Sequence, residues 1–505
     1  CWHHLVWVCR WVGDGLMPLG AAKVALLGAA GSAGGKTYWA LAFHPNTDGD
    51  ESTGLGLAVD SSDNVYWGFY DASGYEGYLV KFEQADGLPT TDVQTKLDNY
   101  VPVSGLTVWD NSGTETLACY GSRNAVSESC WIYNIETDLT TSINSGRSGG
   151  IYINSGDNAG QGSNQAELDT SNGKLFWSSQ DNMSFYGWKT IQAGVWFKNG
   201  YQITQTTYPT YTGGSGISGD HGQNWGCSAF QWGADRWGVA ARRQDTPYII
   251  GNHSTSGQTD VGTAYEYAAS NSNIQSCQSA ATWNPGETGD DYAYWLITNP
   301  IASPNPTVSL IKLNEAGTVS WNRTLTADGM YQPGTTGTAG TSMGKLCKPI
   351  FDSSDNCYIA WGDLNGAGGL GRTSIAKYDS SGVIQWQNAI EVSASANWFA
   401  PQQLALSDDE EDLYVSINRA DFNGGTGIIL KVPSDGSLTS AASIALDGGT
   451  FTYDATSYTE AAGGWSVSTS TTMGWTTSTS QTAAGTGTWG VGSTFTPHLF
   501  TAEVA

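Results

Sequence analysis

The chain has 505 residues and a formal net charge of −26, which comes from 21 basic and 47 acidic side chains. Such a negative field repels phosphate backbones and anionic lipid surfaces, so neither nucleic acid nor a membrane surface is an expected partner. Charged residues make up only 13% of the chain, and a polar uncharged surface of this kind favours a virion or extracellular location.

Residues 1–35 are predicted to form a leader or arm before the folded region. The first sixteen, CWHHLVWVCRWVGDGL, differ from the rest in composition, and we expect them to lie outside the native protein, which would then start at Met17. The apolar run Val24–Ala30 partly resembles a signal peptide but is far too short to span a bilayer. The segment MPLGAAKVALLGAAGSAGG resembles the N-termini of structural proteins of marine tailed bacteriophages, and this resemblance implies a virion protein.

A phrase of strand, tight turn and strand recurs along the chain. LAVDSSDNVYWGF at Leu57–Phe69 and PIFDSSDNCYIAW at Pro349–Trp361 share the turn DSSDN, whose residue types favour hairpins. The turns repeat at intervals of roughly 50 to 70 residues, which is typical of the four-stranded blades of a β-propeller. Weaker copies begin at Leu106, Ala166, Phe230, Trp283 and Leu404.

Several units continue into a third strand with a lysine between apolar residues and a fourth strand with a tryptophan. Lys312 precedes Trp321, and Lys377 precedes Trp386, in this pattern. The early strand GKTYWALAF places Trp39 in the tryptophan position before the first full unit, whereas the seventh unit lacks a tryptophan. We therefore predict that the N-terminal strand completes the last of seven blades, with six or eight as the alternative counts, because closure removes an exposed edge.

This combined pattern resembles the seven-bladed β-propeller repeat of many extracellular and viral proteins. The resemblance covers about residues 37 to 446 and implies an all-β fold without naming catalytic residues. The predicted domains are the arm at 1–35, the propeller at 36–446, and a Trp/Ser/Thr-rich C-terminal extension at 447–505. An extension this polar cannot build a core of its own. It is either a disordered tail or a set of strands that need a partner surface, and its tryptophans favour the second.

The eight cysteines include no CxxC motif and so carry no zinc or redox signature. A hairpin centred midway between Cys119 and Cys130 would place them opposite each other, either as a cross-strand disulfide or as two buried free thiols. Pairing through the second DSSDN turn places Phe351 opposite Cys357, which disfavours a bridge between Cys347 and Cys357.

The segment from Ser218 to Trp225 resembles the Asp-box of sialidases and related propellers, a structural turn between blade strands. The matching positions are Ser218, Asp220, Gly222 and Trp225. The resemblance implies that Asp220 caps a hairpin and that Trp225 packs in the blade. The Arg-Ile-Pro phrase that usually marks the first sialidase arginine is missing, so sialidase activity does not follow.

The long connection Tyr201–Gly226 is the candidate ligand-binding segment. It carries aromatic side chains, a type that can stack on sugar rings. Function in propellers concentrates on such loops. The alternative is that these aromatics seal adjacent blades. The candidate residues are Tyr201, Tyr208, Tyr211 and Trp225.

The acidic clusters do not form a catalytic or metal-binding constellation. Asp290 and Asp291 are adjacent on the chain and would face opposite ways on a strand, so they do not supply the converging pair that a glycosidase needs. The run Asp408–Asp412 is most simply a solvated turn, although calcium is an alternative there and at Asp48–Glu51. No catalytic residue, metal ligand or required cofactor is therefore assigned.

Together these features predict a non-catalytic β-propeller of a phage virion or extracellular surface. It would act in assembly or bind a host-surface ligand such as a glycan, with other virion or surface proteins as partners. Two alternatives remain open: a secreted glycan-active enzyme, sialidase-like or another glycosidase or lyase, and a bacterial surface adhesin.

Overall fold

The computed structural model divides the chain into two compact units, Cys1–Thr37 and Tyr38–Ala505, and every described strand belongs to the second. The described residues are 37–44, 52–71, 76–83, 90–97, 105–110, 114–121, 130–139, 151–153, 164–165, 167–169, 174–183, 188–199, 202–205, 209–212, 227–234, 236–243, 246–254, 263–268, 278–287, 289–299, 307–326, 346–364, 371–392, 398–421, 424–446, 449–462, 466–469, 476–477 and 498–504.

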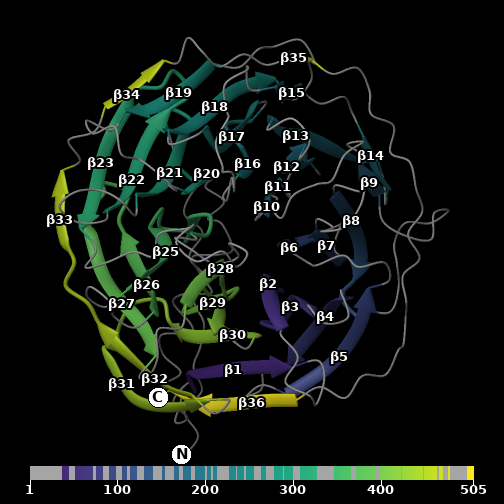
Figure 1. Cartoon of the computed structure of the whole chain (residues 1–505), viewed down its shortest axis with the longest axis vertical. Helices are drawn as coiled ribbons and strands as arrows, with labels where there is room; N and C mark the ends of the chain where they lie inside the picture. The colour runs from purple at the N-terminus through teal and green to yellow at the C-terminus, as the bar shows by residue number, and fades with distance from the viewer. Residues whose placement is uncertain are drawn as a thin grey trace, which may run out of the picture. The chain divides into compact units, whose positions relative to one another are not determined.

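The predicted all-β class is confirmed, because the described residues contain strands and no helix. Nor does any described segment form a helix that is long and apolar enough to cross a membrane. In this part of the chain the strands form seven sheets, numbered here in chain order, in which neighbouring strands are antiparallel except for one short parallel pair, β10 with β16 (Figure 1).

The first four sheets use the chain from residue 52 to residue 268. Sheet 1 contains β2 (Ser52–Val59), β3 (Val65–Asp71), β4 (Glu76–Glu83) and β5 (Thr90–Leu97). Sheet 2 contains β6 (Gly105–Asp110), β7 (Glu115–Gly121), β8 (Cys130–Glu136) and β9 (Ile151–Ile153). Sheet 3 contains β11 (Glu167–Asp169), β12 (Lys174–Met183), β13 (Trp188–Asn199), β14 (Gln202–Gln205) and β15 (Pro209–Thr212). Sheet 4 contains β10 (Asn164–Gln165), β16 (Cys227–Gln231), β17 (Arg236–Arg243), β18 (Thr246–Ser254) and β19 (Thr263–Ala268).

The remaining three sheets follow the same order of consecutive hairpins. Sheet 5 contains β20 (Gln278–Trp283), β21 (Tyr292–Asn299), β22 (Thr307–Asn314) and β23 (Val319–Thr326). Sheet 6 contains β24 (Ile350–Phe351), β25 (Cys357–Leu364), β26 (Gly371–Tyr378) and β27 (Ile384–Val392). Sheet 7 contains β28 (Trp398–Leu406), β29 (Asp412–Asp421), β30 (Gly424–Pro433) and the N-terminal strand β1 (Trp39–His44).

The DSSDN turns explain why this phrase recurs. In the first copy, Oδ1 of Asp60 accepts hydrogen bonds from the backbone N–H groups of Ser62 and Asn64, both at 2.9 Å. Its Oδ2 accepts from the Asn64 amide and the Tyr66 hydroxyl, again at 2.9 Å. Asp63 has a φ of 61°, a left-handed conformation that aspartate tolerates better than most residues. The aspartate thus holds the turn and ties it to the next strand.

The second copy repeats this geometry around Asp352. Its carboxylate accepts from Asn356 and, at 3.0 Å, from the Tyr358 hydroxyl, and it forms an ion pair with Lys377 at 3.0 Å. Burial raises the pKa of Asp352, but the hydrogen bonds from Asn356 and the charge of Lys377 outweigh it and leave the pKa below its ordinary value. The lysine of the repeat therefore neutralises the turn carboxylate within its own sheet.

Cross-strand register shows that the N-terminal strand occupies its predicted place. Trp321 lies opposite Lys312 in sheet 5, and Trp386 lies opposite Lys377 in sheet 6. Trp39 of β1 lies opposite Lys431 of β30 in the same way. β1 is therefore the neighbour of β30 in sheet 7, with Trp39 in the position that Trp321 and Trp386 take in their sheets.

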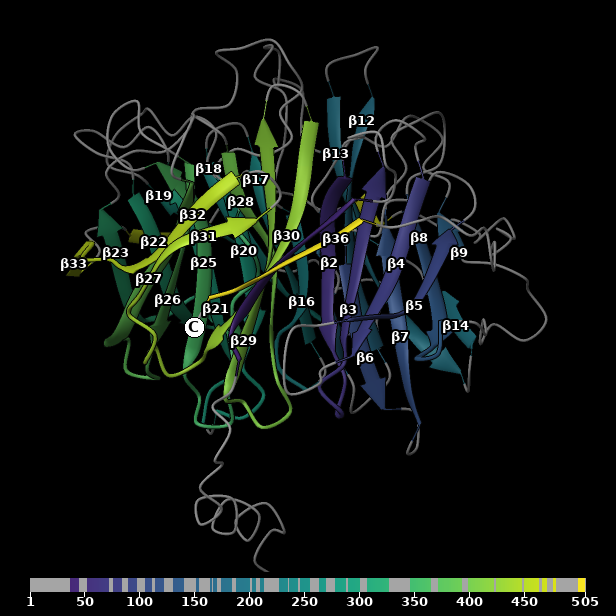
Figure 2. The same cartoon turned by 90° about the horizontal axis from the view of Figure 1, so that it is seen from below.

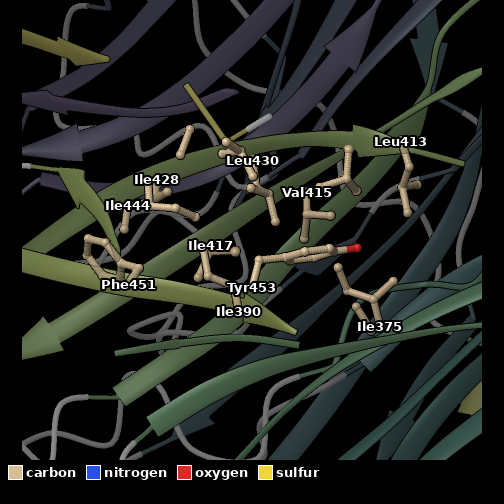
Figure 3. Packing of buried hydrophobic residues seen from close by; sticks show 14 of the residues in the cluster. Ile375, Ile390, Leu413, Val415, Ile417, Ile428, Leu430, Ile444, Phe451 and Tyr453 are labelled. Carbon is tan, nitrogen blue, oxygen red and sulfur yellow. The ribbon is translucent and has the colours of Figure 1, made fainter. Parts of the chain in front are cut away.

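Buried apolar side chains fill the spaces between neighbouring sheets. Described clusters join sheet 7 to sheet 1, sheet 1 to sheet 2, sheet 4 to sheet 5, sheet 5 to sheet 6, and sheet 6 to sheet 7. Figure 3 shows the last of these, in which Ile375 and Ile390 of sheet 6 meet Leu413, Val415 and Leu430 of sheet 7. Among the described residues, sheets 1, 5, 6 and 7 therefore pack apolar side chains on both of their faces.

The C-terminal residues add outer strands to sheets formed earlier in the chain, and the strands β31–β36 are called the strap here (Figure 1 and Figure 2). They cover an outer edge strand in five sheets. Of the two alternatives for the C-terminal extension, a disordered tail or strands that need a partner surface, the described residues show the second. β31 (Ser440–Leu446) and β32 (Gly449–Ala455) join sheet 6, β33 (Thr459–Ala462) joins sheet 5, β34 (Ser466–Thr469) joins sheet 4, β35 (Thr476–Thr477) joins sheet 3, and β36 (His498–Glu503) pairs with β1.

Of the two alternatives for Cys119 and Cys130, the structure favours free thiols over a cross-strand disulfide. Cys119 is a buried free thiol that lies opposite Tyr133, because the β7–β8 register is shifted from a hairpin centred midway between the two cysteines. The prediction that Phe351 lies opposite Cys357 is confirmed. Cys347 and Cys357 are also buried and free.

Candidate functional site

The aromatic loop singled out from the sequence falls largely outside the described residues. Tyr201, Tyr208 and Trp225 are among the residues not described, and the backbone of Tyr211 lies in β15 opposite Ile191. The loop therefore stays a prediction. The same holds for the Asp-box-like positions Ser218, Asp220, Gly222 and Trp225, and for Asp48–Glu51.

The acidic turn Asp408–Asp412 serves as a set of structural acceptors. Asp409 accepts from the Ser407 hydroxyl at 2.6 Å and from the Glu411 N–H at 3.0 Å. Asp412 is buried and forms an ion pair with Lys431 at 3.1 Å. Within the described ranges, no three His, Cys, Asp or Glu side chains are arranged to hold a metal ion.

Turns of neighbouring sheets are also joined to one another. The Ser353 N–H donates to Glu410 at 2.8 Å, which links sheet 6 to sheet 7. The Asp408 N–H donates to Asp63 at 2.9 Å, and the Ser61 N–H donates to Glu115 at 3.0 Å, so the links continue to sheets 1 and 2. The first serine of DSSDN (Ser61 and Ser353) and the last aspartate of the first copy (Asp63) therefore serve as contacts between sheets.

Asp290 and Asp291 do not form a catalytic pair. The Asp290 carboxylate accepts from the Asn314 amide at 3.2 Å, whereas the Asp291 carbonyl oxygen accepts from the indole N–H of Trp232 at 3.0 Å. The first contact is within sheet 5, and the second joins sheet 5 to sheet 4. Both aspartates thus take part in turn and sheet contacts.

A buried polar network lies at the other end of sheet 6 from the DSSDN turn. Arg372 makes a bidentate pair with Asp363, with donor–acceptor distances of 2.8 and 3.1 Å. The Ser374 hydroxyl donates to the same carboxylate at 3.0 Å. The Tyr458 hydroxyl donates to its other oxygen at 2.6 Å, and the two hydroxyls lie 2.5 Å apart. All four side chains are buried, so the carboxylate is satisfied by protein groups alone.

Tyr458 links the strap to this network. It lies between β32 and β33, and its ring contacts Trp361 with centroids 5.4 Å apart and the Arg372 guanidinium at 4.9 Å. Burial raises the pKa of the Tyr458 hydroxyl, and the neighbouring Asp363 carboxylate raises it further. A hydroxyl held protonated in this way is a hydrogen-bond donor and not a nucleophile.

A pocket of about 450 Å³ adjoins the network, and it is partly open to solvent. Sheet 6 supplies its floor, while Thr326 at the end of β23 and the connection between β32 and β33 supply its walls. The lining is mainly polar and includes a guanidinium, two carboxylates and several hydroxyls. The lining residues are Thr326, Arg372, Ala389, Glu391, Thr452, Asp454, Ala455, Thr456, Ser457, Tyr458 and Thr459.

The sheet register explains how these residues come together. Arg372, Glu391 and Thr452 are successive cross-strand partners on β26, β27 and β32. The adjacent row on the same face consists of Ser374, Ala389 and Asp454. Sequence reasoning missed this site because its parts, from Thr326 to Thr459, are up to 133 residues apart. The signal available in the sequence was the pair of charged residues, Asp363 and Arg372, at the two ends of the loop between the apolar strands β25 and β26.

Comparison of the chain with protein-family models finds no match, and a search of curated proteins finds none either.

Proposed function

We propose that the unit Tyr38–Ala505 is a seven-bladed β-propeller that acts as a non-catalytic protein of a phage virion or extracellular surface. In this proposal the seven sheets are the blades, and it functions in assembly or in binding a host-surface glycan.

The closure of the last sheet supports the propeller. Sheet 7 combines strands from both ends of the unit, since Trp39 pairs with Lys431. The described cores connect sheet 6 to sheet 7, sheet 7 to sheet 1, and sheet 1 to sheet 2, as a cyclic arrangement requires. A propeller leaves only short, protected sheet edges, and the strap covers several of those here.

The observation that carries the non-catalytic role is the use of the repeat's reactive side chains. In the second DSSDN copy the carboxylate of Asp352 bonds to both Lys377 and Tyr358, and in the first copy Asp60 accepts from Tyr66. The tryptophan donates to a turn of the next sheet, as Trp386 does to the Ser434 carbonyl oxygen at 3.1 Å. These groups therefore serve the architecture and leave ligand contacts to loops and crevices.

A secreted glycan-active enzyme is the second candidate. Glu391 and Asp454 line one pocket, and glycosidases use a pair of carboxylates. A bacterial surface adhesin is the third candidate and would share the binding role.

Binding and turnover measured on the purified full chain separate these functions. We expect retention on a glycan array and no release of aglycone from aryl glycosides or sialosides. Turnover that is lost in Glu391→Gln or Asp454→Asn would overturn the non-catalytic role. Capsid, portal or tail genes beside this one would support a virion protein, whereas carbohydrate-utilisation genes would contradict it.

A further inference from the structure

A small residue, Ala389, lines the pocket beside the strap. Its cross-strand partners are Ser374 on β26 and Asp454 on β32. Glu391 lies two residues along the same strand and on the same face. A longer side chain at position 389 would project into the space that the pocket occupies.

The lining can exchange hydrogen bonds with a ligand rich in hydroxyl groups. Threonine and serine hydroxyls both donate and accept, and carboxylates accept strongly from hydroxyl groups. The Glu391 and Asp454 carboxylates lie at the pocket, and Asp454 is exposed to solvent. The hydroxyl-bearing lining residues are Thr326, Thr452, Thr456, Ser457 and Thr459.

Electrostatics favour an uncharged ligand over an anion. The Arg372 guanidinium is the cationic group in the lining, and its charge is already neutralised by the bidentate pair with Asp363. Arg372 is one cation against the three carboxylates of Asp363, Glu391 and Asp454, so the group carries an excess of negative charge, which disfavours a sialic or uronic acid. The volume of about 450 Å³ lies within the range of roughly 300 to 1,000 Å³ that is usual for small-molecule sites.

We propose that this pocket binds a neutral sugar residue, either a free monosaccharide or the terminal unit of a glycan. The inference rests on the proposed function for the choice of a glycan, and it assigns the site and the charge class of the ligand. The sugar contacts sheet 6 on one side and the strap connection between β32 and β33 on the other. Binding therefore also stabilises the docked position of the strap around Tyr458.

Titration of the full chain with methyl glycosides of glucose, galactose, mannose and N-acetylglucosamine tests the site, with N-acetylneuraminic acid as the anionic probe. We expect saturable binding of at least one neutral sugar by calorimetry or saturation-transfer NMR, and none of the acid. Ala389→Leu fills the hollow and abolishes binding. Asp454→Asn weakens it about tenfold by removing one charged acceptor. Asp408→Asn makes the same chemical change at an exposed turn of sheet 7 and serves as the control.

The outcomes separate failure of the site from failure of the proposed function. Neutral-sugar binding that is unchanged in both pocket variants overturns this site, while glycan binding by the chain stands. Binding of N-acetylneuraminic acid alone overturns the ligand class. Absence of any saturable binding overturns the site, and an empty glycan array would then count against the glycan role as well. If Ala389→Leu does not fold, Asp454→Asn decides the question, because that side chain is exposed.

Discussion

Removal of the Tyr458 hydroxyl tests how the strap is held to sheet 6. Tyr458→Phe keeps the ring contacts with Trp361 and Arg372 and deletes only the hydrogen bond to Asp363 at 2.6 Å and the contact with Ser374 at 2.5 Å. A hydrogen bond to a charged group contributes about 1.5–3 kcal/mol. Because Asp363 keeps its bidentate arginine and the serine hydroxyl, we expect a loss of about 2 kcal/mol of unfolding free energy.

Two comparison variants bracket this value. Arg372→Leu leaves a buried carboxylate without its cation, and loss of one partner of a buried pair costs about 3–5 kcal/mol. Tyr378→Phe removes a hydroxyl from the same sheet that takes no part in the Asp363 network, so it should cost less than the loss of the Tyr458 hydroxyl. The expected order of destabilisation is therefore Arg372→Leu, then Tyr458→Phe, then Tyr378→Phe.

Urea unfolding followed by tryptophan fluorescence measures the global effect, and hydrogen exchange measured by mass spectrometry reports on β33. In Tyr458→Phe, amides of Thr459–Ala462 should exchange faster, whereas those of β21 should not change. Equal midpoints and equal β33 protection in Tyr458→Phe and Tyr378→Phe would refute the conclusion that the buried network anchors the strap.

Three further predictions follow from the turns and the buried thiols. Gly382 has a φ of 77°, and a Cβ there would lie 2.7 Å from Cδ2 of Trp321, so Gly382→Ala should cost about 1–3 kcal/mol in urea unfolding. Gly289 is also at positive φ but has open space around it, so Gly289→Ala measures the cost of backbone strain without a side-chain clash. An equal loss of unfolding free energy in both variants would contradict a contribution from the contact with Trp321. The pKa of Asp352 in the folded state lies below its ordinary value of 3.8. The ionised carboxylate therefore stabilises the fold above pH 3.8, and this contribution is lost as the pH falls through the lower, folded-state pKa. Asp352→Asn should therefore be less stable than wild type at pH 7 and show a smaller loss on acidification below pH about 4, and parallel acid-unfolding curves would contradict this. Burial raises the pKa of the Cys119 thiol, so iodoacetamide should label it only after denaturation, as peptide mass spectrometry would show, and labelling in the native protein would contradict its burial.

The turns and the strand completing sheet 7 could be predicted because they depend on short-range chemistry. Asp60 and Asp352 cap their own turns within a few residues, so the motif itself reports the hairpin. The tryptophan position of Trp39 was recognisable because two units, with Trp321 and Trp386, repeat the same order of lysine and tryptophan. The register of β7 and β8 was not predictable in this way, since the connection between them carries no turn motif, and Cys119 consequently lies opposite Tyr133.

The candidate pocket could not be predicted from local pattern, because its parts come from distant segments. Thr326, Arg372 and Asp454 belong to three separate stretches of the chain, and none carries a recognisable motif. Their proximity depends on where the strap docks, which is decided by edge-strand pairing and by the buried hydroxyl of Tyr458.

The sequence by itself determined the all-β class, the recurring Asp–Tyr–Lys–Trp unit and the early strand that completes the last sheet, because these follow from alternation and turn chemistry between near neighbours. Only the tertiary structure decided that the C-terminal extension forms outer strands on five sheets and that Asp363, Arg372 and Tyr458 share one buried network. The physical reason is that hydrogen bonding along a strand edge is not specific to sequence. Which edge a polar segment covers is therefore settled by packing and by the few buried polar contacts that fit.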